Sequence, residues 1–184
     1  MVTTKRITVE DLERDGVPDG LWELIDGRLV EVTPAGSDAS NRGTLVSYYL
    51  TDHVLPRRLG RVYGANGGCV LFQGQSNEMI RVPDAAFVRA DRVPPPAERA
   101  RFLRIPPDLV VEVISPHDSA REMADKAALW LEAGVLLVWV IDPRARTVAV
   151  HVRGRPVRVL AEGDELDGGD VLPDFRVPVA ELFQ

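Results

Sequence analysis

The stretch PPDLVVEVISPHDSAREMADKAALWLEAGVLLVWVIDP, residues 106–143, decides the fold of this chain. Residues 108–114 and 136–141 are apolar at most positions, which is typical of strands that are buried on both faces of a covered sheet. Between them, Ser119 and Glu122 form a capping box, which predicts a helix that connects the two strands. The order strand, helix, strand therefore predicts a sheet that is covered by helices.

Outside this stretch, the sequence predicts a short helix, a long helix and several short strands. Thr8 is a typical N-cap for a helix over 9–14, and Asp26-Gly27 is a strong hairpin signal between strands over 22–26 and 28–33. Apolar residues at helical spacing predict a long helix over 40–59, which Pro56 should end or kink. Further strands are expected over 61–65, 69–73, 79–88, 147–152 and 156–160. This alternation predicts an α/β or α+β sheet domain.

Length and composition indicate a folded globular protein. The 184 residues, 45% hydrophobic and 27% charged, predict a single folded domain over residues 1–184. The apolar run over residues 134–141 is far shorter than the roughly 20 residues that a membrane helix needs, and the chain begins without the apolar segment of a signal peptide. We therefore expect a cytoplasmic protein with no membrane partner. The single cysteine, Cys69, excludes an internal disulfide, and the lack of further cysteines or grouped histidines leaves no zinc framework.

The net charge of −6 argues against binding of nucleic acid by bulk positive charge. The middle of the chain differs, because residues 38–110 carry ten basic and seven acidic side chains. Part of this segment, residues 91–107, is rich in proline and arginine and predicts an exposed, mobile loop. Arginines gather in two groups, either of which could face phosphates or simply solvate a surface: Arg57, Arg58 and Arg61, and Arg99, Arg101 and Arg104.

Glu112 is a carboxylate in the middle of an apolar strand, so its charge needs a metal, a base or a hydrogen-bond network opposite. Strand alternation places Asp108 on the same face, but four residues at about 3.3 Å each separate the two by roughly 13 Å. Asp108 therefore fits better as a supporting group at the start of the strand. Asp84 is a better partner, since Pro83 could bend its strand and aim the carboxylate at Glu112; Pro-Asp is also a common turn.

Lys126 is one of only two lysines among 22 basic residues. A helical wheel places it with the apolar side chains of its helix, so that its ammonium could reach Glu112. The alternative is an exposed pair with Glu122, four residues earlier. Two carboxylates and a lysine form a site for a hard cation such as Mg²⁺ (or Mn²⁺), in which the ammonium can orient or deprotonate an attacking water.

The order Pro83-Asp84, Glu112-Val113-Ile114 and Lys126 resembles the PD-(D/E)XK nuclease superfamily with its lysine moved to the next helix. WELIDGRLVEVTP, RVPDAAFV and PPDLVVEVISPHD, together with the segments that follow, resemble the Uma-type restriction endonuclease family over most of residues 20–183. The resemblance implies a restriction-endonuclease-like αβββαβ core with a mixed central sheet flanked by helices and extra N- and C-terminal strands.

The resemblance also implies roles for individual residues. Asp84 and Glu112 would be metal ligands, Lys126 would complete the catalytic group, and Glu23 and Asp108 would have accessory roles. For Glu23 an equal alternative is that it only decorates a strand edge before the hairpin turn.

Two functions follow from these patterns. The first is an endonuclease that uses Mg²⁺ to hydrolyse phosphodiester bonds in DNA, with a homodimer expected from the resemblance. The alternative is a catalytically inactive nuclease fold that binds nucleic acid or protein, which the acidic net charge and the isoleucine at position 114 would favour. Glycoside hydrolysis by a carboxylate pair is a weaker third option, since it gives the lysine no task.

Overall fold

Six strands form the main sheet of the computed structural model, which describes residues 6–116 and 118–184. Their order is β10-β9-β8-β7-β6-β3. The pair β7–β8 is parallel and the other pairs are antiparallel, so the sheet is mixed. The bounds are β3 Gly60–Gly64, β6 Ala85–Arg89, β7 Leu109–Val113, β8 Leu137–Asp142, β9 Thr147–Val152 and β10 Arg158–Ala161.

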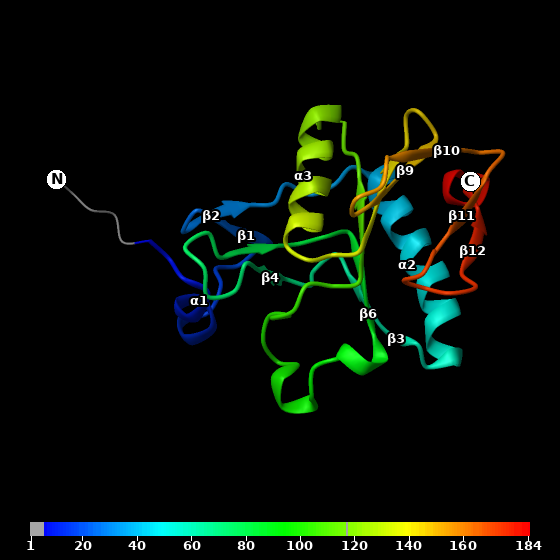
Figure 1. Cartoon of the computed structure of the whole chain (residues 1–184). Coiled ribbons are helices and arrows are strands. Elements are labelled where there is room, and N and C mark those ends of the chain that lie inside the picture. The colour runs from blue at the N-terminus through cyan, green and yellow to red at the C-terminus, as the bar shows by residue number, and fades with distance from the viewer. Residues whose placement is uncertain (1–5, 117) are drawn as a thin grey trace.

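A helix covers each face of this sheet (Figure 1). Helix α2, Ser37–Arg57, packs on the face that carries Phe87, Val111 and Trp139. Helix α3, Ala120–Glu132, connects β7 to the parallel β8 and packs on the opposite face, against Val110 and Val138. The order α2, β3, β6, β7, α3, β8 confirms the αβββαβ core, and both faces of β7 are buried as its apolar sequence predicts.

A second, four-stranded sheet, of order β2-β1-β5-β4, lies on the α3 side of the molecule (Figure 1). It joins the predicted N-terminal hairpin to a hairpin that is inserted between β3 and β6. Asp26 and Gly27 both have positive φ, at 50° and 72°, as a tight two-residue hairpin turn requires. The bounds are α1 Val9–Asp15, β1 Trp22–Ile25, β2 Arg28–Glu31, β4 Cys69–Leu71 and β5 Met79–Arg81.

The prediction of one strand over residues 79–88 is wrong. The segment forms β5 in the second sheet and β6 in the main sheet, and Val82, Pro83 and Asp84 lie between them. Proline has no N–H to donate to a ladder, so the chain leaves one sheet at this point and enters the other. The break places Asp84 directly before β6.

Residues 91–107 are irregular, as predicted, but they are anchored at several points. They contain one 3-10 turn, Pro96–Glu98, and a second, Ala90–Arg92, begins just before them. Leu103 forms a parallel bridge with Cys69, and Arg104 forms ion pairs with Glu10 and Glu13 of α1. The segment therefore spans from the main sheet to α1.

The C-terminal part of the chain packs on the α2 side of the main sheet (Figure 1). It consists of a two-stranded sheet, β11 Glu165–Asp167 and β12 Arg176–Pro178, and a 3-10 helix over Val179–Phe183. Among the described residues, no helix is both long and apolar enough to span a membrane.

Candidate functional site

Glu112 lies in β7 with 2% of its side chain exposed, and two groups of α3 hold its carboxylate. Lys126 Nζ donates to Oε2 at 2.7 Å, and Trp130 Nε1 donates to Oε1 at 2.7 Å. The buried carboxylate of Glu112 therefore has a charged partner, Lys126, as we expected from the sequence. Each oxygen receives one hydrogen bond, which fixes the orientation of the carboxylate.

Helix α3 places Lys126 and Trp130 one turn apart, so both side chains lie on the face that packs against β7. The Ser119–Glu122 capping box that begins the helix is present, which excludes Glu122 as the main partner of Lys126 because its carboxylate is bound to Ser119. Trp130 was not among the site residues predicted from the sequence. Its spacing of four residues from Lys126 is the signal that would have found it.

Asp84 lies opposite Glu112 across the β6–β7 ladder. Ala85 pairs with Val111, and extending this antiparallel register by one residue sets Asp84 against Glu112. The Val113 N–H donates to Asp84 Oδ2 at 2.7 Å, and the Asp84 N–H donates to the Val111 carbonyl at 3.1 Å. The carboxylate of Asp84 is thereby fixed at the carboxyl end of β7, beside Glu112.

Burial raises the pKa of both carboxyls. Burial is the largest cause that raises the pKa of Glu112 to about 7; the charge of Asp84 contributes in the same direction, and the attraction of Lys126 opposes both. For Asp84 the exposed Asp118, which was not among the predicted site residues, also raises the pKa. One ammonium therefore does not fully compensate the negative charge at this place.

We expect Glu112 to make the metal-free protein less stable as pH rises. Its folded pKa of about 7 exceeds the unfolded value of 4.5, so the native state binds the proton more tightly. This contribution is complete below about pH 4.5 and is lost as pH rises through about 7; it reaches about 3 kcal/mol at most. Urea unfolding in EDTA at pH 5 and pH 8 measures it as the difference between wild type and Glu112→Gln. A difference that is independent of pH would contradict the assignment.

Glu23 holds the segment that leads to Asp84. Its Oε1 accepts a hydrogen bond from the Val82 N–H at 3.0 Å, and its Oε2 lies 3.1 Å from Arg81 Nη1. Glu23 is buried in β1 of the second sheet, so this contact connects the two sheets where the chain passes between them. The Glu23 side chain is therefore buried and holds the backbone two residues before Asp84; it does not only decorate a strand edge.

The structure does not bring Asp108 to the other three residues. Asp108 precedes β7 at the end opposite Glu112 and is completely buried. Its carboxylate accepts hydrogen bonds from the Arg89 N–H at 2.8 Å and from Arg92 Nη1 at 2.6 Å. These contacts explain how its charge is buried, and they match the interpretation of a supporting group at the start of the strand.

The donor set of Asp84 and Glu112 fits a hard divalent cation. In residues 6–116 and 118–184, no three histidine, cysteine, aspartate or glutamate side chains are grouped as metal ligands. Mg²⁺ is commonly held by one or two carboxylates, with water and substrate phosphate in its other positions. Two buried carboxyls with raised pKa values and a single ammonium leave a deficit of positive charge that such a cation would compensate.

The mixed sheet with its αβββαβ core defines a restriction-endonuclease-like fold. The Uma2 family model, described as "Putative restriction endonuclease", matches residues 9–180, and the chain belongs to this family. The fold is similar to the crystal structure of "a putative nuclease belonging to DUF820" from Anabaena variabilis, with a TM-score of 0.80 and 20% sequence identity over 96% of this chain and 97% of that chain. A comparison with curated proteins gave no match. The family predicted from the sequence is confirmed, and it places the protein among the nucleases.

Proposed function

We propose that this protein is an endonuclease that uses Mg²⁺ to hydrolyse phosphodiester bonds in DNA. One observation carries the proposal: the buried Glu112 contacts Lys126 at 2.7 Å, and Asp84 lies opposite Glu112 in the strand register. Membership of the Uma2 family supports a nuclease. The choice of a divalent metal rests on the chemistry of these carboxylates, and the choice of DNA rests on the description of the family as restriction endonucleases.

The carboxylates of Asp84 and Glu112 are the groups that would hold Mg²⁺ or Mn²⁺. When bound, the cation would supply Lewis-acid stabilisation of the phosphate and a more acidic water. Lys126 Nζ favours the ionised form of Glu112 and offers its remaining N–H donors to an attacking water or to a phosphate oxygen. The side chain is about a quarter exposed, so a substrate at the mouth of the site can reach it.

Two further side chains act through these groups. Trp130 fixes Glu112 Oε1 and closes the apolar side of the site. Glu23 keeps residues 81–82 in place and so positions Asp84, which is the accessory role we assign to it. A smaller loss of cleavage in Glu23→Gln than in Glu23→Ala tests this role, because glutamine still accepts the Val82 hydrogen bond.

Nicking of a supercoiled plasmid tests the proposed function. We expect the wild type to convert the plasmid to nicked or linear DNA with Mg²⁺ or Mn²⁺ and to lose this activity in EDTA. Glu112→Gln has the same shape without the charge and should be inactive under all of these conditions. Binding of DNA without cleavage under any divalent cation would contradict the proposal and favour a catalytically inactive module. Cleavage that survives Glu112→Gln would reject this site.

A further inference from the structure

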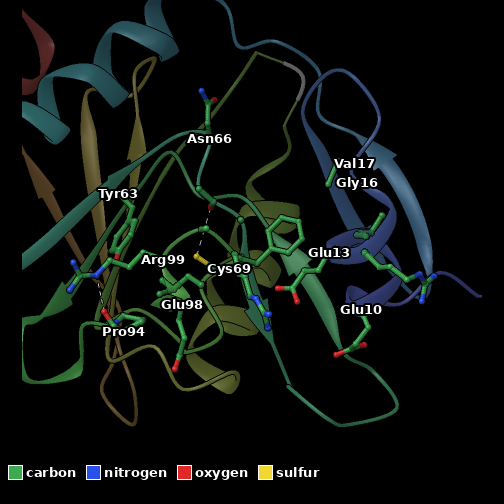
Figure 2. Close-up of a pocket in the computed structure, with 18 of the residues that line it drawn as sticks. Glu10, Glu13, Gly16, Val17, Tyr63, Asn66, Cys69, Pro94, Glu98 and Arg99 are labelled. Atoms are coloured by element: carbon green, nitrogen blue, oxygen red, sulfur yellow. Dashed lines mark hydrogen bonds between the residues drawn. The ribbon is translucent and has the colours of Figure 1, made fainter. Parts of the chain in front are cut away.

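A concave site lies apart from the candidate catalytic group, and none of Asp84, Glu112 and Lys126 lines it. It is a cavity of about 760 Å³ between α1, the start of β3, the segment Asn66–Cys69 and the segment Glu98–Leu103. Figure 2 shows Tyr63 and Arg99 on one side of it and Glu13 of α1 on the opposite side. Its size falls within the roughly 300–1,000 Å³ of pockets that hold small molecules or single chemical groups.

The cavity brings together side chains from both arginine groups. Arg61 comes from the first group, and Arg99 and Arg101 come from the second. Arg99 Nε donates a hydrogen bond to the Pro94 carbonyl at 2.9 Å, which fixes the side chain. The terminal nitrogens of Arg99 are left for a ligand. Within the described part of the chain, Arg61 and Arg101 have no ion pair.

The acidic side chains of α1 cancel only part of this positive charge. Arg104 pairs with Glu10 at 3.2 Å and with Glu13 at 2.8 Å and so offsets one of these two negative charges. Arg61, Arg99 and Arg101 then outweigh the remaining charge of α1 and that of Glu98. The cavity is therefore positive on balance and suits an anionic ligand.

Two aromatic rings line the cavity beside a glycine pair. A Cβ at Gly68 would lie 2.7 Å from Cδ1 of Phe102, and a Cβ at Gly67 would lie 3.6 Å from the Cβ of Tyr63. Glycine at position 68 is thus what allows the Phe102 ring to lie against the Asn66–Cys69 segment. Aromatic rings together with arginine are the groups on which proteins stack nucleobases.

The cavity lies on the same face of the main sheet as Glu112. Tyr63 pairs with Ala86 of β6, and Ala86 pairs with Val110 of β7, two residues before Glu112. Two strand spacings across the sheet and two residues along β7 combine to about 12 Å, comparable with three or four nucleotides of a stacked strand at about 3.4 Å each. In agreement, the Glu112 charge helps burial to raise the pKa of Cys69, which lines the cavity.

We propose that this cavity holds one unpaired nucleotide of the DNA strand that the catalytic group cleaves. The base would stack on Tyr63 or Phe102, Arg61 and Arg99 would contact its phosphate, and Glu98 and Asn66 would face polar base edges. A base can enter such a cavity only after it has left the helix, so the preferred substrate is DNA with an unpaired nucleotide rather than a perfect duplex. The inference rests on the proposed function because its ligand is part of that substrate.

Binding in EDTA tests the inference without requiring cleavage. Fluorescence anisotropy at a fixed salt concentration compares a perfect duplex, the same duplex with one bulged adenosine, and the same bulge without its base. We expect the bulged duplex to bind about tenfold more tightly than the other two DNAs. Tyr63→Ala should remove this preference and Tyr63→Phe should keep it. Equal affinity for all three DNAs, or equal weakening of all three by Tyr63→Ala, would overturn the inference.

Two controls separate this inference from the proposed function. Asp84→Asn should keep the preference for the bulge, because it changes only the catalytic group. If the protein prefers the bulged duplex but no cation supports cleavage, the cavity assignment stands and the proposed function fails. If the protein cleaves DNA but does not prefer the bulged duplex, the proposed function stands and the cavity assignment fails. If Tyr63→Ala does not fold, Arg99→Ala is the replacement test, because Arg99 is exposed. This variant should reduce binding of the bulged duplex more than binding of the perfect duplex.

Discussion

Replacing Asp84 by asparagine is expected to reduce metal-dependent DNA cleavage by about 100- to 1,000-fold. Asparagine has nearly the same shape, and its oxygen can still accept the hydrogen bond from the Val113 N–H that holds the side chain at 2.7 Å. The change therefore removes the negative charge and little else. Initial rates of plasmid nicking at saturating Mg²⁺ and Mn²⁺ measure the effect, and thermal unfolding should show a folded variant.

Asp52→Asn is the matched control for this prediction. Asp52 is an exposed aspartate of α2, on the opposite side of the main sheet from α3, so the same chemical change there should leave cleavage unchanged. If Asp84→Asn cleaves DNA within about threefold of the wild type while it remains folded, Asp84 does not take part in the reaction.

Replacing Lys126 by methionine is expected to reduce cleavage by about 100-fold and to destabilise the metal-free protein at alkaline pH. The change leaves Glu112, which is 2% exposed, with Trp130 as its remaining hydrogen-bond donor. Breaking a buried ion pair typically costs about 3–5 kcal/mol, but a carboxyl can avoid part of this by binding a proton. Loss of the lysine raises the Glu112 pKa further, so the destabilisation should be larger at pH 8 than at pH 5.

Lys126→Arg tests whether cleavage needs only a positive charge at this position or an ammonium that can release a proton. Arginine retains the positive charge and should restore most of the stability, but it cannot release a proton as a lysine can, so cleavage should stay low. Urea unfolding at the two pH values and nicking rates of both variants provide the measurements. Wild-type cleavage in Lys126→Met would exclude the ammonium from the reaction.

Local signals made much of this fold predictable. The capping residues Thr8 and Ser119 begin their helices as expected, and Asp26-Gly27 forms the hairpin turn. Each of these depends on a few neighbouring residues, whose hydrogen bonds and backbone angles follow from the residue types. The apolar run of β7 predicted a strand with both faces covered, and Glu112 stood out because it breaks that run.

Pairing between distant segments was not predictable in the same way. Nothing near Met79 indicates that β5 pairs with β1, so residues 79–88 were expected to form one strand instead of two in different sheets. The register that sets Asp84 opposite Glu112 likewise depends on how β6 and β7 meet. The convergence of Arg61 and Arg99 on one cavity is a product of the same tertiary arrangement.

The candidate site shows how far residue chemistry alone can lead. A charge in an apolar strand requires a partner, and Lys126 was found from its place on the buried side of its helix. Trp130 was missed because an indole on an apolar face first suggests core packing, although its N–H also needs an acceptor when it is buried. Asp108 shares the strand face of Glu112 but lies at the far end of the strand, where Arg89 and Arg92 compensate its charge.

The central claim is that Asp84 and Glu112 together hold a divalent cation, with Lys126 beside it. Crystals grown with Mn²⁺ and measured at a wavelength that gives anomalous scattering from manganese test it most directly. We predict an anomalous peak in contact with both carboxylates, and its loss in crystals of Asp84→Asn. A map without a peak between these two side chains at saturating Mn²⁺, or with manganese bound only elsewhere, would contradict the account.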